Sequence, residues 1–141
     1  FVHCTASRQT WSVDALLKEF TNKGWHYPGY HWIVEANGKA TQLMTEDLPS
    51  NGVKGYNHES INVAYMGGIS RSGKPIDNRT DEQKATLREL LTELKQRYPE
   101  AKILGHRDIS PDLNHNGKVD VWERIKACPC FDAIPEYADI K

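Results

Sequence analysis

Two stretches of the chain carry apolar residues at the three- and four-residue spacing of an amphipathic helix. The first covers residues 12–23, begins at a serine suited to capping a helix, and is followed by Gly24. The second begins at Thr80, whose spacing to Gln83 is that of a capping box, and stops at Pro99. The predicted apolar faces consist of Val13, Leu16, Leu17 and Phe20 in the first helix and of Leu87, Leu90, Leu91, Leu94 and Tyr98 in the second.

Short apolar runs outside these helices predict β-strands. Residues 31–35 and 39–43 flank an Asn-Gly pair, which is a strong hairpin signal. Residues 61–66 are apolar enough for a central strand, and residues 2–5 and 102–104 predict two shorter ones. Because strands and helices alternate along the chain, the pattern predicts an α/β fold in which helices pack against a central sheet.

Composition narrows the range of functions. The 141 residues suit a single domain over 1–141, and a formal net charge of −1 gives no basic field for nucleic acid. No apolar run approaches the ~18–20 residues that cross a bilayer, so we expect no transmembrane segment. No signal peptide is visible, and any targeting segment is expected upstream of Phe1. Three cysteines give no disulfide framework and suit metal binding or core packing.

Histidine and cysteine residues at the ends of predicted elements suggest a metal site. Catalytic zinc takes three protein ligands and leaves a fourth position for water. His3, His106 and Cys128 would make such a site. We choose Cys128 over Cys130 because Pro129 separates the two thiols, which should therefore diverge. The chain has no H-E-x-x-H helix, which excludes a zincin protease.

Six short motifs follow one another between His3 and Asp132, which is nearly the whole chain. They are HCTAS at 3–7, GYHW at 29–32, KGYNHESI at 54–61, MGG at 66–68, GHRD at 105–108 and KACP at 126–129. Each is weak alone, but together they resemble the zinc-dependent N-acetylmuramoyl-L-alanine amidase family. The nearest branch is the phage-lysozyme type, which is also similar to peptidoglycan recognition proteins. The resemblance implies a mixed central β-sheet flanked by helices, with a zinc-containing groove on one side.

The resemblance also implies roles for single residues. By position it gives the same three zinc ligands, makes Tyr30 the catalytic tyrosine and places Lys126 at the reacting carbonyl. The alternative for Tyr30 is an ordinary core aromatic residue. The alternative for Lys126 is a solvated charge at a helix end. We expect His58 to contact substrate, against the alternative of a structural hydrogen bond. His31 is expected to be structural, and Asp108 to brace its loop or a ligand histidine.

Residues 112–123 match the twelve-residue calcium-loop pattern D-x-[DN]-x-[DN]-G-x5-E. The stretch departs from the shorter members of the family that the chain resembles, in which the second histidine is followed almost directly by the Lys-x-Cys-Pro motif. Gly117 would supply its sharp turn, and an unliganded polar turn is the alternative. Bound calcium would fix a short helix predicted over 121–126, which leads to Cys128. The candidate calcium ligands are Asp112, Asn114, Asn116, the Lys118 carbonyl, Asp120 and Glu123.

The predicted function is therefore a zinc hydrolase that cleaves the amide bond between N-acetylmuramic acid and L-alanine. Its substrate would be peptidoglycan or muropeptides in a bacterial or phage-type setting of cell-wall degradation, and we expect a monomer. Two alternatives remain: a module that binds muropeptides without hydrolysis, and a structural zinc or calcium interaction domain. The joint presence of Cys128, Tyr30 and Lys126 favours the enzyme.

Overall fold

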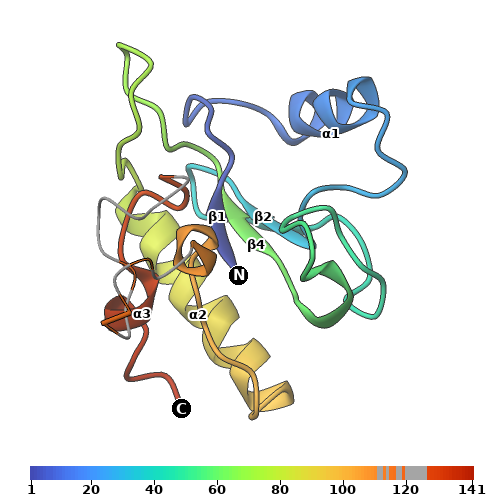
Figure 1. The fold of residues 1–141 in the computed structure, drawn as a ribbon. Coiled ribbons are helices and arrows are strands. Elements are labelled where there is room, and N and C mark those ends of the chain that lie inside the picture. The colour runs from blue at the N-terminus through green and yellow to red at the C-terminus, as the bar shows by residue number, and fades with distance from the viewer. Residues whose placement is uncertain (111–112, 114, 117–118, 120–126) are drawn as a thin grey trace.

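A four-stranded sheet forms the centre of the computed structural model, which describes residues 1–110, 113, 115–116, 119 and 127–141 (Figure 1). In spatial order its strands are β1 (Val2–Cys4), β4 (Val63–Tyr65), β2 (Trp32–Val34) and β3 (Ala40–Gln42). β4 pairs in parallel with both β1 and β2, whereas β2 and β3 form an antiparallel hairpin. The sheet is therefore mixed, as expected.

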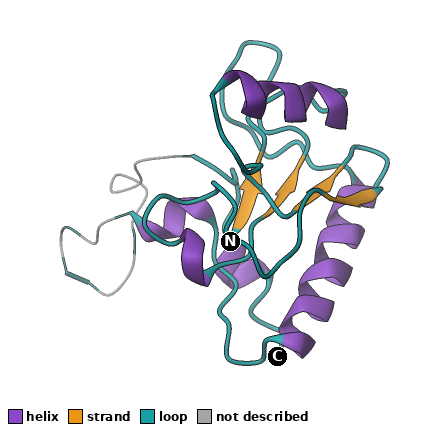
Figure 2. Cartoon of the chain, turned by 90° about the vertical axis from the view of Figure 1, so that its right-hand side faces the viewer, coloured by secondary structure: helices purple, strands orange, loops and turns teal. Residues whose placement is uncertain are grey.

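The two long helices, α1 (Val13–Asn22) and α2 (Asp81–Arg97), pack against opposite faces of this sheet (Figure 2). Successive side chains of a strand point to opposite faces. Val63 and Tyr65 accordingly share a core with the leucines of α2, while Ala64 joins the α1 core with Leu16 and Phe20. Among the described residues, no helix is long and apolar enough to cross a membrane.

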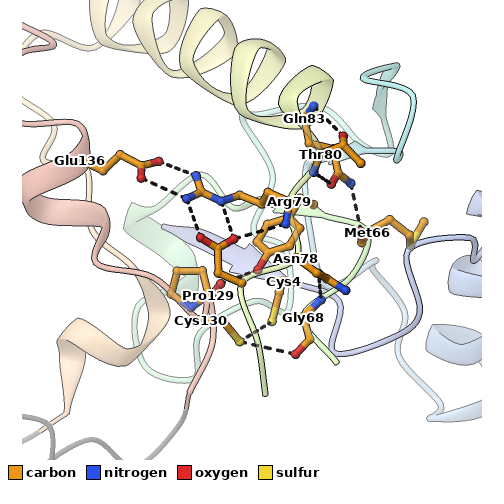
Figure 3. Close-up of polar contacts among 12 residues, drawn as sticks. Cys4, Met66, Gly68, Asn78, Arg79, Thr80, Gln83, Pro129, Cys130 and Glu136 are labelled. Atoms are coloured by element: carbon orange, nitrogen blue, oxygen red, sulfur yellow. Dashed lines mark hydrogen bonds and ion pairs between the residues drawn. The ribbon is translucent and has the colours of Figure 1, made fainter. Parts of the chain in front are cut away.

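Both helices begin with the caps that the sequence predicts. The Ser12 hydroxyl accepts the Ala15 amide hydrogen at 3.1 Å. At the start of α2, Thr80 and Gln83 each accept the other's backbone amide hydrogen, at 3.1 and 3.0 Å. Gln83 also donates through its side-chain amide to backbone carbonyls at the ends of β2 and β4 (Figure 3). The capping box thus also ties α2 to the sheet.

The C-terminal third differs from the sequence prediction. The strand expected at 102–104 is not formed, and the backbone of this segment pairs with β1 through a bond from Val2 to Leu104 (2.8 Å) and an isolated bridge at Gly105. The chain then turns into a short 3-10 helix, η2 (His106–Ile109). The helix predicted over 121–126 lies outside the described residues. Two elements were not predicted: α3 (Ala133–Glu136) and the 3-10 helix η1 (Asn57–Glu59).

Candidate metal centre

The first strand and the turn beside it bring two histidines together. His3 is the central residue of β1 and is 1% exposed. The bridge between Val2 and Gly105 places the start of η2 next to this strand, and His106 is its first residue. The two imidazole rings therefore lie with their centroids 4.9 Å apart. A backbone contact between segments far apart in the sequence thus creates the pair.

Cys128 completes a group of three ligand-type side chains. Its carbonyl accepts the Arg107 amide hydrogen at 2.9 Å, which ties its loop to η2. Its Sγ accepts the Cys4 amide hydrogen at 3.2 Å and lies 3.7 Å from His3 Nδ1. The ligand atoms of His3, His106 and Cys128 all lie within 4.8 Å of one another.

This donor set fits a metal ion. Two imidazoles and one thiolate suit zinc, whose bonds to nitrogen and sulfur are about 2.0–2.3 Å long, so small side-chain movements would bring all three onto one ion. The orientation of His3 also fits, because its Nδ1 faces Cys128 while its Nε2 lies 2.7 Å from Asn62 Oδ1. The group can therefore hold a metal and leave a fourth position for water.

The other two cysteines lie against each other. Cys130 Sγ lies 3.9 Å from Cys4 Sγ and 3.6 Å from the Gly68 carbonyl (Figure 3). The structure thus brings Cys128, and not Cys130, to the two histidines. Contact with the Cys128 thiol, together with burial, raises the pKa of Cys4 to about 12, so that thiol stays protonated at neutral pH. Cys4 is 4% exposed and packs in the core.

Tyr30 lies beside the candidate metal ligands. Its ring centroid is 5.1 Å from that of His3, and its other side packs on Phe20 of α1. The hydroxyl donates to the Cys4 carbonyl at 3.2 Å. The residue is partly exposed, but protein surrounds its hydroxyl, and this burial raises the pKa of Tyr30 well above its ordinary value. At neutral pH the hydroxyl is therefore a hydrogen-bond donor.

The other predicted residues that the structure describes are not members of this ligand group. His31 is buried, with its ring bonded to the Asn62 amide and the Leu48 carbonyl, which fits a structural role. Asp108 accepts the Gly105 amide hydrogen at 2.7 Å and so braces η2. His58 is exposed on η1 and lines a groove with Phe1 and Tyr56 in which the three ligand residues take no part.

Two predicted features fall on parts of the chain that the structure does not describe. Lys126 lies outside the described residues. Of the candidate calcium ligands only Asn116, which is exposed, lies within them. The other five, outside the described residues, are Asp112, Asn114, Lys118, Asp120 and Glu123.

The fold and the ligand group together define a candidate metalloenzyme, and comparison with known proteins gives its family. The profile of the family N-acetylmuramoyl-L-alanine amidase matches residues 1–130. The endolysin of Klebsiella phage KP32 is 36% identical over 134 residues, which is 94% of this chain and 80% of that protein. The endolysin of Escherichia phage T7 is 34% identical with the same coverage.

A solved structure shows the same fold. The Ph2119 endolysin from Thermus scotoductus MAT2119 bacteriophage Ph2119 superposes with a TM-score of 0.72 at 21% identity, covering 98% of this chain and 80% of that one. The chain belongs to the N-acetylmuramoyl-L-alanine amidase family, and it is a peptidoglycan amidase.

Proposed function

We propose that the protein is a zinc hydrolase that cleaves the amide bond between N-acetylmuramic acid and L-alanine in peptidoglycan. The observation that carries the zinc assignment is the convergence of His3, His106 and Cys128. Family membership supports the choice of bond, and the phage endolysins among its relatives support a phage-type setting.

The chemistry asks for a nucleophile and for donors to the developing oxyanion. When bound, zinc lowers the pKa of water from ~15.7 to about 7, so that hydroxide is available at neutral pH. His3, His106 and Cys128 would hold the metal, and Cys128 would bind it through a deprotonated sulfur. The Tyr30 hydroxyl, held beside His3, can turn its proton from the Cys4 carbonyl toward an oxyanion formed over the site. Such preorganised donors are worth most in sites shielded from water.

Replacing Tyr30 with phenylalanine is expected to lower kcat by ~10²–10³-fold, which is the usual loss for one oxyanion donor. Zinc content and KM should change little, because the ring and its packing on Phe20 remain. Steady-state kinetics on soluble muropeptides would measure both constants. Tyr27→Phe, which removes a hydroxyl from a ring packed on His26, serves as the matched control. Wild-type kcat in Tyr30→Phe would leave Tyr30 as an ordinary core aromatic.

Lys126 and the calcium loop are proposed from the sequence alone. Lys126 is assigned as a second donor at the reacting carbonyl because it precedes Cys128 by two positions in the family-like motif. Calcium at 112–123 is assigned a structural role, in which it orders the approach to Cys128.

Purified cell walls provide the direct test of the proposed function. Incubation with the protein is expected to release new L-alanine amino termini, detected by amine labelling and amino-acid analysis of the labelled ends. Treatment with a chelator should stop the release and added zinc should restore it, while metal analysis of the untreated protein reports zinc and calcium together. Absence of new L-alanine termini would contradict the proposed enzymatic function. Binding to cell walls without release would support a module that binds muropeptides without hydrolysis.

A further inference from the structure

We propose that Asn62 positions His3 as a metal ligand by holding its ring in the tautomer with a proton on Nε2 and a lone pair on Nδ1. This inference rests on the proposed zinc function. Asn62 directly precedes β4, is 0% exposed, and its Oδ1 lies 2.7 Å from His3 Nε2. On the other side of the same ring, Nδ1 lies 3.7 Å from Cys128 Sγ.

The hydrogen bonds on the two sides of the Asn62 side-chain amide describe the direction of this contact. Asn62 Nδ2 donates to the Ser50 hydroxyl at 2.7 Å, and Ser50 is itself 1% exposed. In this arrangement Asn62 presents its oxygen, an acceptor, to His3, and the contact is a hydrogen bond when Nε2 carries the proton. In the reversed arrangement Nδ1 would carry the proton and point it at Cys128, which would prevent Nδ1 from binding a metal.

The surroundings hold the Asn62 amide in place. Its backbone amide donates to His31 Nδ1 at 3.0 Å, and His31 Nε2 is bonded to the Leu48 carbonyl at 2.7 Å. Gly52 packs directly on the side chain, since a Cβ there would lie 2.4 Å from Asn62 Cγ. Rotation of the amide by half a turn would present Nδ2 to His3 Nε2 and Oδ1 to the Ser50 hydroxyl, and it would require the ring proton to lie on Nδ1. His31 and Gly52 therefore restrict the position of Asn62.

The chemistry of metal-bound histidine explains why this contact matters. A ligating imidazole usually donates its second ring N–H to an oxygen, which fixes the ring orientation and makes the ligating nitrogen more basic. Loss of such a partner typically weakens metal binding by ~10–100-fold. Asn62 is thus a positioning residue that acts through His3 and has no assigned contact with substrate.

Zinc affinity without substrate provides the test. Asn62→Leu keeps a similar volume but removes the acceptor, and it is expected to weaken zinc binding by ~10–100-fold in competition with a chromogenic chelator. Asn62→Asp keeps an acceptor and should restore the affinity to at least that of the wild type. Gln83→Leu is the matched control, because Gln83 is another fully buried amide but bonds to the carbonyls of Val34 and Met66.

The outcomes separate this inference from the proposed function. A wild-type protein that binds no zinc would overturn both. If the wild type binds zinc and Asn62→Leu binds it as tightly, the positioning role of Asn62 is wrong but the zinc function stands. The same conclusion follows if Gln83→Leu weakens zinc binding as much as Asn62→Leu does. Nitrogen-15 spectra of the metal-free wild type should show His3 with its proton on Nε2. A proton on Nδ1 would overturn the inference even if Asn62→Leu did not fold.

Discussion

Replacing Cys128 with alanine is expected to lower kcat/KM for peptidoglycan cleavage by at least ~10³-fold, because Lewis-acid assistance is worth several kcal/mol and each 1.36 kcal/mol is tenfold in rate. The substitution removes the one thiol of the three-residue ligand group. It also removes the sulfur that accepts the Cys4 amide hydrogen and faces His3 Nδ1. Release of L-alanine termini measures the activity, and metal analysis measures zinc per chain.

Cys130→Ala is the matched control for this substitution. Cys130 lies two positions further along the same loop, and its sulfur contacts Cys4 Sγ and the Gly68 carbonyl. The variant should therefore keep its zinc and most of its activity. If Cys130→Ala lost zinc while Cys128→Ala retained it, the ligand assignment would be wrong. If neither variant lost activity, catalysis would not depend on this metal site.

The parts of the fold that the sequence predicts are those decided by neighbouring residues. Ser12 and the Thr80–Gln83 pair mark helix starts because each cap closes within three residues. The strand predicted at 102–104 fails for the opposite reason. Its residues are apolar enough for a strand, but only one bridge to β1 is available where the chain turns into η2. The local pattern carries no information about that geometry.

In the candidate site, too, local motifs are predictable from the sequence, whereas contacts between distant segments are not. The motifs point to His3, His106 and Cys128, but their meeting depends on the bridge at Gly105 and on the bond from Arg107 to the Cys128 carbonyl. Residues that support the site from a distance are harder to find. Asn62 lies 59 positions from His3, and the only local signal is a polar residue inside the apolar run 61–66.

Arg79 is a second residue that supports the site from a distance, and its side chain contacts the C-terminal part of the chain. Its side chain is 2% exposed and bonds to Asp77 at 2.9 Å and to Glu136 of α3 at 3.0 Å (Figure 3). Its guanidinium carbon lies 3.4 Å from the ring centroid of Phe131. Phe131 follows Cys128 by three positions, so this cluster anchors the chain directly after the metal-ligand loop.

Arg79→Met is expected to lower the free energy of unfolding at neutral pH by about 2–3 kcal/mol. Breaking a buried ion pair typically costs 3–5 kcal/mol, and this value is lower because water still reaches Asp77 and Glu136, which are 30% and 34% exposed. Denaturant unfolding of the zinc-loaded protein would measure it. Lys23→Met is the control, since Lys23 and its partner Glu19 lie at the end of α1, are 50% and 43% exposed, and such pairs contribute at most ~1 kcal/mol.

The same variant should also change the response of stability to acid. Hydrogen bonds from Arg79 hold the pKa of Glu136 below its ordinary value of 4.5, and they lower the pKa of Asp77 although burial acts to raise it. A carboxyl group with a depressed pKa stabilises the fold above its ordinary pKa, and the contribution is lost as pH falls through the lowered value. Wild-type stability should therefore decline below about pH 4.5 more steeply than that of Arg79→Met. Equal acid dependence in the two proteins, or equal stability at neutral pH, would show that this cluster does not anchor α3.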